Sequence, residues 1–380
     1  MAFIFFVYSS QELYQSTDAV LHQLSHLDRI FPSSQFLQTQ RALLLYHNKE
    51  LEEAETIFST IIQRDPHRID SLDHYSNILY VMGTRPKLAF LAQLATATDK
   101  FRPETCCVVG NYSSLKSEHE KAVMYFRRAL TLDRSFTSAW TLMGHEYVEM
   151  KNTHAAIESY RRAVDVNRKD YRAWYGLGQT YEMLEMHYYA LYYHQRAASL
   201  RPYDPKMWQA VGSCFGKMDR PTEAIKAFKR ALIVGGYHDQ TGSFGSHSTV
   251  TPTGDGAVMD PDILYQIALQ YEKANNYSEA SAFMELTLQQ EYGPADESDE
   301  DGHGDADGGA AGQGVGVTHT TSKARMWLAK WEFSRGGLAR AMKLATELCQ
   351  DGVEVEEAKA LVRDLRARLE QGEDDGRVSL

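Results

Sequence analysis

The residues of this chain that could carry out chemistry do not complete a catalytic motif. His145-Glu146 begins like HExxH, in which two histidines one helical turn apart bind zinc, but Glu149 stands where the second histidine would be. Gly176 and Gly178 begin like a nucleotide-binding glycine loop that lacks its third glycine. The sequence contains no Walker loop and no GxSxG nucleophile motif. We therefore predict a protein that is not an enzyme and binds no metal and no cofactor.

The four cysteines give the same indication. Cys106 and Cys107 are adjacent, Cys214 and Cys349 are isolated, and none belongs to a CxxC pair. This spacing suits neither a zinc site nor a disulfide framework. It favours reduced thiols in the cytosol or nucleus.

The net charge of −11 is concentrated in two glycine-rich stretches. Residues 239–260 hold three acids and residues 293–322 hold seven, and neither stretch contains Lys or Arg. Both read as flexible, solvated insertions, because such compositions cannot bury enough apolar surface to fold. The remainder is nearly neutral. No stretch approaches the roughly 20 apolar residues that span a bilayer, and we predict no membrane and no nucleic-acid partner.

The sequence repeats with a period of 34 residues, and this repeat defines the helices that must position the polar residues. Trp140, Trp174 and Trp208 are each 34 residues apart. With position 1 at Thr137, Tyr171 and Pro205, position 4 is Trp, position 8 is Gly, position 11 is aromatic, and positions 20 and 27 are Ala. This is the tetratricopeptide pattern, in which small residues let two antiparallel helices, A and B, pack closely.

The same frame extends in both directions, with a final amphipathic helix near 354–370. We therefore predict an all-α, right-handed superhelical solenoid of about nine helix pairs with a C-terminal capping helix. The predicted segments are repeats over 1–238 (strongest over 103–238), an insertion over 239–260, a repeat over 261–292, an acidic insertion over 293–322, a terminal repeat with the capping helix over 323–370, and a tail over 371–380.

In this frame, positions 2, 5, 9 and 12 of helix A line the concave surface. The residues predicted there, or directly beside it, are Asn111, His145, Glu146, Tyr175, Gln179 and Glu182. Carboxylates and an aromatic ring suit an extended peptide that carries Arg or Lys, through charge-assisted hydrogen bonds. The alternative is that these are ordinary solvated helix faces.

Basic pairs recur at positions 25 and 26 of helix B. They are Arg127-Arg128, Arg161-Arg162 and Lys229-Arg230. The common phase places them together on the outer face of the array, where they could contact an acidic partner or nucleic acid. We favour the simpler interpretation, a solvated helix face.

Long strings resemble more than the general repeat pattern. The strings ETCCVVGNYSSLKSEHEKAVMYFRRALTLD (104–133), AWTLMGHEYVEMKNTHAAIESYRRAV (139–164) and DYRAWYGLGQTYEMLEMHYYALYYHQRAASLRP (170–202) are similar to the subunit 8 family of the anaphase-promoting complex. The similarity is strong over about 65–235. It implies a non-catalytic scaffold of a nuclear, multisubunit ubiquitin ligase that acts in mitosis, found in nucleus and cytoplasm.

The resemblance also implies partners. Family members contact the other repeat subunits of the complex and hold an Arg-containing coactivator motif in the groove. On this sequence, Asn111 and Glu146 would serve that groove, with Tyr175, Gln179 and Glu182 beside them. The family homodimerises through N-terminal repeats, several of which would precede Met1, so the sequence leaves homodimer formation open.

One other class of function competes with this interpretation. A tetratricopeptide chaperone adaptor captures the C-terminal carboxylate of a peptide, which requires Lys or Arg on helix A. The corresponding positions here favour Asn, Glu and Tyr, and this counts against an adaptor.

Overall fold

The computed structural model describes residues 17–31, 34–241, 259–291, 315–351 and 355–377. Within these residues, eight antiparallel helix pairs are flanked by an N-terminal helix and a C-terminal helix. They fall into two compact units, residues 1–202 and 203–380. The predicted all-α tetratricopeptide fold is confirmed.

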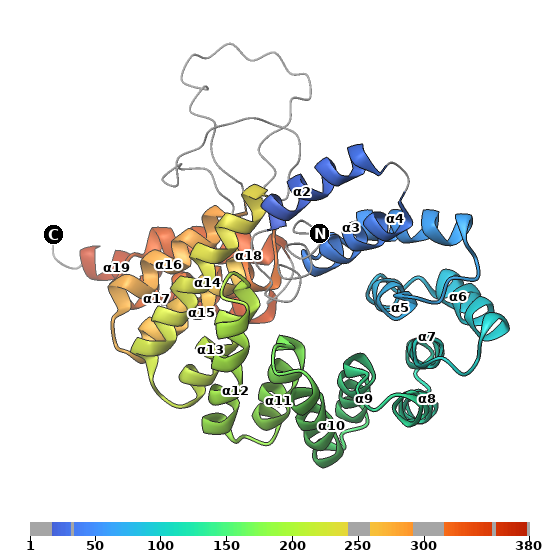
Figure 1. The fold of residues 1–380 in the computed structure, drawn as a ribbon. Coiled ribbons are helices and arrows are strands. Elements are labelled where there is room, and N and C mark those ends of the chain that lie inside the picture. Colours follow the sequence, from blue (N-terminus) through green and yellow to red (C-terminus); the bar gives the residue numbers. More distant parts are fainter. Residues whose placement is uncertain (1–16, 32–33, 242–258, 292–314, 352–354, 378–380) are drawn as a thin grey trace, which may run out of the picture. The chain divides into compact units, whose positions relative to one another are not determined.

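The first unit contains five pairs after the helix α2 (Thr17–Ile30). The pairs are α3 (Gln35–His47) with α4 (Leu51–Arg64), α5 (Leu72–Val81) with α6 (Arg85–Thr98), α7 (Pro103–Leu115) with α8 (His119–Leu132), α9 (Thr137–Glu149) with α10 (Thr153–Val166), and α11 (Tyr171–Met183) with α12 (His187–Leu200). Successive pairs follow a curve, with α5, α7, α9 and α11 on its inner side and α6, α8 and α10 on its outer side (Figure 1).

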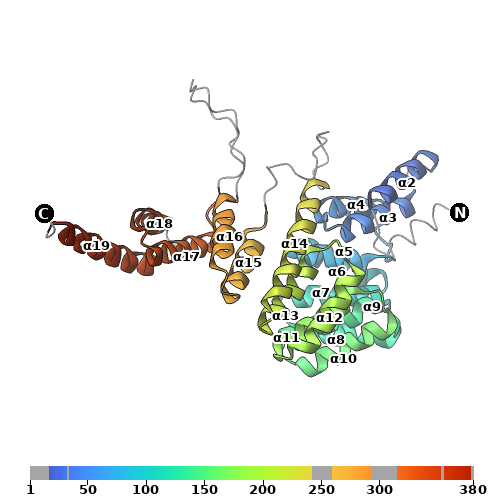
Figure 2. The same ribbon diagram turned by 90° about the vertical axis from the view of Figure 1, so that its left-hand side faces the viewer.

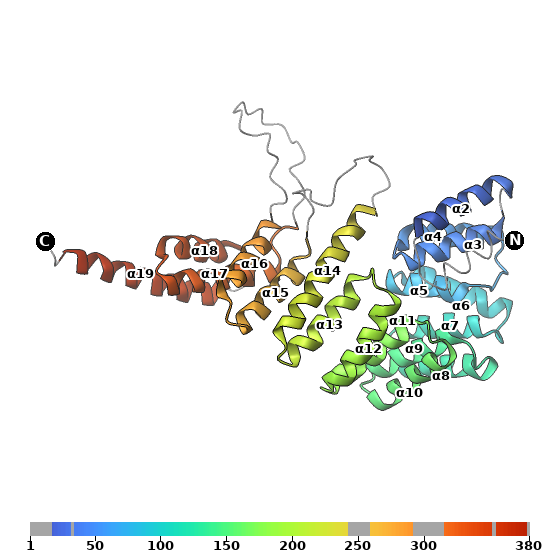
Figure 3. The ribbon, with the colours of Figure 1, turned by 60° about the vertical axis from the view of Figure 1, so that its left-hand side comes forward.

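The second unit contains three pairs and the C-terminal helix. The pairs are α13 (Pro205–Lys217) with α14 (Pro221–Thr241), α15 (Pro261–Lys273) with α16 (Tyr277–Gln289), and α17 (His319–Arg335) with α18 (Leu338–Asp351). Figure 3 shows these three pairs in succession. The last helix is α19 (Val355–Arg377), which extends from the α17–α18 pair (Figure 2). Ala358, Leu361, Val362 and Leu365 of α19 join the hydrophobic core of that pair, as expected of a capping helix.

Close contact within a pair depends on the absence of a side chain at position 8. A Cβ placed on Gly144 of α9 would lie 2.5 Å from Cε1 of Tyr160 of α10. Tyr160 is among the largest fully buried side chains of the chain. The glycine lowers helix propensity by about 1 kcal/mol, and the packing of a fully buried ring against the neighbouring helix backbone compensates for that cost.

The turn between helices A and B is also set by the repeat. Ser117, Lys151 and Glu185, each at position 15, have φ of 62°, 57° and 58°. This left-handed conformation ends helix A and lets the next residue bond back to it. The Asn152 N–H donates to the Tyr147 carbonyl at 2.8 Å and the Met186 N–H donates to the Tyr181 carbonyl at 2.9 Å. These are the six-to-one bonds of a Schellman ending.

The helix ends differ from the predicted segments at three places. Helix α14 continues to Thr241, α17 begins at His319 inside the predicted acidic insertion, and α19 continues to Arg377 through the predicted tail. Thr318 explains the early start of α17, because it forms a reciprocal capping box with Thr321. No proline follows residue 370 to stop α19. Most of the two predicted insertions, at 242–258 and 293–314, lies outside the described residues.

None of the described helices is both long enough and apolar enough to cross a lipid bilayer.

Candidate peptide-binding face

The inner face of the first unit is built from polar residues that bond between consecutive helices. Asn111 of α7 is only 2% exposed. Its side-chain amide donates to Ser76 Oγ at 2.8 Å and to Asn77 Oδ1 at 2.7 Å, both on α5. The amide protons of Asn111 therefore join two repeats, and little of the side chain reaches the surface that the sequence predicted it to line.

Glu146 of α9 forms a second connection of this kind. It is 5% exposed, and both of its carboxylate oxygens accept hydrogen bonds. The Ser114 hydroxyl donates to Oε1 at 2.7 Å, and His119 Nδ1 lies 2.8 Å from Oε2. Because the carboxylate is buried and both of its oxygens already accept hydrogen bonds from the preceding repeat, Glu146 acts first as a tie between α9 and the α7–α8 pair.

His145 precedes Glu146 and has a different environment. Its side chain is exposed. The Tyr160 hydroxyl lies 2.8 Å from His145 Nδ1, and the two rings meet edge to face with centroids 5.5 Å apart. The ring is thus held in one orientation while part of its surface faces solvent, which suits a contact with a bound peptide.

The three predicted residues of α11 lie around one buried histidine or beside it. The Tyr175 ring meets His194 of α12 edge to face at 5.2 Å, and a Glu182 carboxylate oxygen is 3.6 Å from His194 Nε2. Gln179, one turn from each of them, is exposed. The structure therefore brings Tyr175, Gln179 and Glu182 together on one helix face, with two of them positioned by His194.

Two aspartates that sequence reasoning missed also serve the inner face. Asp170 caps α11 by accepting from the Arg172 N–H at 3.1 Å, and its other oxygen accepts from the Thr141 hydroxyl at 3.1 Å. Asp73 of α5 accepts from the Ser138 hydroxyl of α9 at 3.1 Å, across 65 residues of sequence. Asp170 could have been found as an N-cap directly before α11, whereas nothing local marks Asp73.

A basic cluster also reaches this face. The Arg172 guanidinium carbon lies 4.8 Å from the Tyr46 ring centroid, and that of Arg201 lies 4.7 Å from the Tyr171 ring centroid. Arg201 also donates to the His47 carbonyl, 154 residues away in sequence. Burial, followed by Arg172, His74 and Arg201, lowers the pKa of His47 to about 2. Helix α11 is thereby joined to α3 by the cation–π contact of Arg172 with Tyr46.

Three of the basic residues predicted on the outer face form hydrogen bonds within the array. Arg127 donates to the Tyr147 hydroxyl at 2.9 Å, Arg161 to that of Tyr181 at 2.7 Å, and Lys229 to that of Tyr271 at 2.8 Å. Each bond runs from position 25 of one repeat to position 11 of the next. These three cations therefore join neighbouring repeats.

The cysteines are free thiols in the described residues. Burial raises the pKa of the Cys106 and Cys107 thiols. Both therefore stay protonated at neutral pH, which makes them poor nucleophiles and poor metal ligands.

Comparison with known proteins shows what the chain as a whole is similar to. A family model for anaphase promoting complex subunit 8 / Cdc23 matches residues 1–42, and tetratricopeptide repeat models match residues 103–136 and 144–184. The subunit CDC23 of the anaphase-promoting complex from Saccharomyces cerevisiae is 48% identical over 360 residues, which cover 94% of this chain. Subunit 8 from Arabidopsis thaliana is 50% identical over 145 residues, 38% of this chain.

The resemblance to subunit 8 of the anaphase-promoting complex is confirmed. The chain spans 51% of the length of the yeast CDC23 relative and 25% of that of the plant subunit 8 relative. Both relatives are named as subunits of a complex, which supports the prediction that this chain is not an enzyme.

A solved structure supports the fold independently. The Cut9 and Hcn1 hetero-tetramer of the same complex aligns over 92% of this chain and 59% of its own, with a TM-score of 0.58 and 17% sequence identity. At that identity the match concerns the fold alone.

Proposed function

We propose that this chain is a non-catalytic scaffold of the anaphase-promoting complex, a ubiquitin ligase of mitosis, in nucleus and cytoplasm. The observation that carries the proposal is the 48% identity to the yeast complex subunit along 94% of the chain. The partners would be neighbouring subunits of that complex and, on the inner face, an Arg-containing motif of a coactivator.

The bonds between repeats support a scaffold role. Buried polar ties connect two of the helices A to the preceding repeat: Asn111 of α7 to Ser76 of α5, and Glu146 of α9 to Ser114 of α7. The bonds from Arg127 and Arg161 to the tyrosines of the following repeat act on the outer side. A solenoid whose repeats are joined on both sides resists bending and holds its binding surfaces at fixed spacing.

The predicted residues of the inner face fall into two groups according to their exposure. His145 and Gln179 are exposed and Tyr175 and Glu182 are half-buried, so these four can touch a peptide. Asn111 and Glu146 are buried and engaged, so they set the spacing of the helices beneath it. Glu182 would accept the guanidinium of the motif, because a charge-assisted bond between Arg and a carboxylate is among the stronger polar contacts.

The charges on this face predict the orientation of a bound peptide. Arg172 and Arg201 lie beside Tyr46 and Tyr171, near the first turn of α11 and the end of α12. Glu182 lies near the end of α11, about 15 Å from Arg172 along a helix that rises 1.5 Å per residue. We expect the arginine of the motif near Glu182 and a neutral or acidic part of the peptide near Arg172.

A binding measurement with the coactivator's N-terminal peptide tests this assignment. Glu182→Gln should weaken binding about tenfold, since a hydrogen bond to a charged group contributes roughly 1.5–3 kcal/mol. Glu120→Gln, an equal charge change at an exposed position of α8, is the control and should leave binding unchanged. Equal affinity of the Glu182→Gln variant and the unmodified chain would remove Glu182 from the site.

A further inference from the structure

Two hollows of the first unit repeat with the period of the sequence. We define each junction pocket as the hollow where helix B of one repeat ends and helix A of the next begins. The first, of about 720 Å³, is lined by Arg134, Trp140 and Arg162 among others. The second, of about 350 Å³, is lined by Arg168, Trp174 and Arg196. Each of the three residues in the second pocket lies 34 positions after its counterpart in the first.

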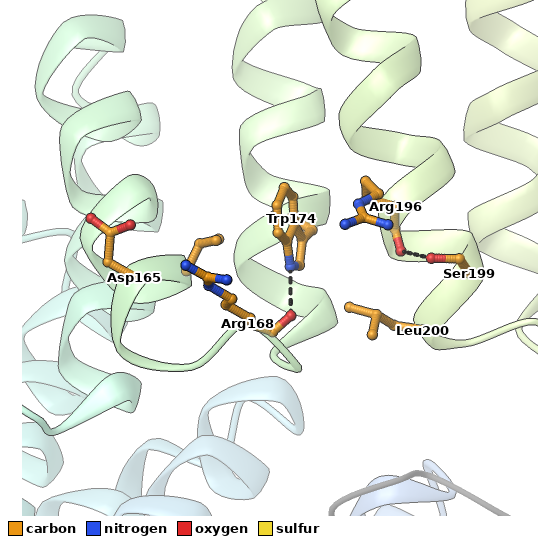
Figure 4. Close-up of a pocket in the computed structure, with 7 residues that line it drawn as sticks. Asp165, Arg168, Trp174, Arg196, Ser199 and Leu200 are labelled. Carbon is orange, nitrogen blue, oxygen red and sulfur yellow. Dashed lines mark hydrogen bonds between the residues drawn. The ribbon is translucent and has the colours of Figure 1, made fainter.

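The tryptophan at each junction is fixed in orientation. Trp140 Nε1 donates to the Arg134 carbonyl at 3.0 Å, and Trp174 Nε1 donates to the Arg168 carbonyl at 2.9 Å. Because the indole N–H is already bonded, what each tryptophan offers to the pocket is the surface of its ring. Figure 4 shows the guanidinium groups of Arg168 and Arg196 on the two sides of the Trp174 ring.

The second pocket carries positive charge without matching carboxylates. Arg168 and Arg196 are exposed, and neither forms an ion pair with a residue that the structure describes. The Arg196 guanidinium carbon is 5.8 Å from the Trp174 ring centroid. Asp165 also lines the pocket, so the lining holds one carboxylate and two guanidinium groups.

The first pocket has the same plan with more of its charge engaged. Arg162 pairs with Glu158 at 3.1 Å, and Arg127 donates to Tyr147. Arg134 is exposed and forms no ion pair with a described residue. One guanidinium therefore remains available here, compared with two at the second pocket.

We propose that the junction pockets bind an extended acidic segment of a partner polypeptide, with an anionic side chain at each pocket. A planar guanidinium binds a carboxylate or a phosphate through two parallel hydrogen bonds. The tryptophan ring supplies apolar surface for the side chain beside the anion. The 34-residue repetition offers the same contact twice along one edge, and two linked contacts bind more tightly than either alone. None of the six residues predicted for the inner face lines either pocket.

The surroundings favour a peptide over nucleic acid. Tryptophan rings and arginines also bind single strands, but Glu158 and Asp165 line the first pocket and Asp165 also lines the second. A phosphate backbone would meet these carboxylates at regular intervals, whereas a peptide can place neutral residues opposite them.

The test measures binding of labelled peptides to the full chain by fluorescence anisotropy. The probe holds two Glu-Leu pairs joined by Gly-Ser spacers of graded length, and its counterparts carry Gln or phosphoserine in place of Glu. A single-stranded oligonucleotide is the fourth ligand. We expect the Glu or the phosphoserine peptide to bind, with an optimum spacer length, and the Gln peptide to bind at least tenfold more weakly.

Charge reversal then locates the site. The double variant Arg168→Glu, Arg196→Glu should lose at least tenfold in affinity for the anionic peptide. The double variant Arg363→Glu, Arg366→Glu makes the same charge change at exposed positions of α19 and should retain it. Circular dichroism melting of both variants verifies that they are folded.

Three results would overturn the proposal: equal binding of the Glu, phosphoserine and Gln peptides, equal losses in both double variants, or an oligonucleotide that outcompetes every peptide. The Glu182→Gln variant separates this proposal from the proposed function, because it should leave binding to the junction pockets intact.

Discussion

Gly144 lies so close to Tyr160 that a Cβ on the glycine would come within 2.5 Å of the ring carbon Cε1. The contact joins positions 8 and 24 of one repeat. It recurs between Gly110 and Phe126 at 2.5 Å and between Gly212 and Phe228 at 2.8 Å. The absence of a side chain at position 8 is therefore what allows an aromatic ring at position 24 to be buried.

Gly144→Ala is expected to destabilise the first unit by about 1–3 kcal/mol, because the added methyl group displaces a fully buried ring. The measurement is the free energy of unfolding in urea. Gly235→Ala is the matched control, since its Cβ would meet only Pro205 Cβ, at 3.9 Å. That substitution should be neutral or stabilising by up to about 1 kcal/mol. Equal effects of the two substitutions would contradict the packing account.

Glu146→Ala should lower the free energy of unfolding by about 2–4 kcal/mol. The change leaves the Ser114 hydroxyl and the His119 ring without the carboxylate they now bond. Glu149→Ala, at an exposed position of the same helix, should change the free energy by less than about 0.5 kcal/mol. If Glu146→Ala lowers the free energy of unfolding no more than Glu149→Ala does, then Glu146 is not a tie between repeats.

The lowered pKa of His47 predicts that the chain loses stability in mild acid. Its pKa is about 2 in the folded chain and 6.5 as the ordinary value, so protons bind the unfolded state more readily. Stability contributed by the neutral ring is present above pH 6.5 and is lost as the pH falls from 6.5 toward 2. The loss should reach about 2 kcal/mol between pH 7 and pH 5.

The comparison that checks this prediction is urea unfolding of the unmodified chain and of His47→Gln at both pH values. The variant should lose about 2 kcal/mol less than the unmodified chain over the same interval. An identical pH dependence of the two proteins would show that His47 titrates normally in the folded state.

Arg325 should be among the most sensitive positions of the second unit. It is 3% exposed and bonds the buried carboxylate of Glu291. Arg325→Ala leaves that carboxylate buried and without its cation, which costs about 3–5 kcal/mol. Arg363→Ala on the exposed side of α19 is the control. A thermal melt that shifts no more for Arg325→Ala than for the control would argue against a structural ion pair.

The repeat pattern predicted the elements of the fold because its key contacts are local. Gly144 and Tyr160 lie 16 residues apart in one helix pair, and the left-handed residue at position 15 recurs in every clear repeat. The helix phase also predicted His145 and Gln179 at surface positions, and both are exposed in the structure. These features depend on helix geometry alone.

The bonding of the inner face could not be predicted, because it depends on how far each repeat rotates against the next. Asn111 and Glu146 were predicted as peptide contacts, whereas the structure engages both with neighbouring repeats. Whether they also touch a peptide stays a prediction. Tyr46 and Arg172 meet across several repeats, and no pattern within a single repeat encodes that contact.

The central claim is that this chain is a scaffold of the anaphase-promoting complex, and affinity purification of the tagged chain from mitotic cells tests it most directly. The account predicts that the other subunits of the complex and a ubiquitin ligase activity are recovered with it. Recovery of heat-shock chaperones without those subunits would contradict the account and would favour a chaperone adaptor.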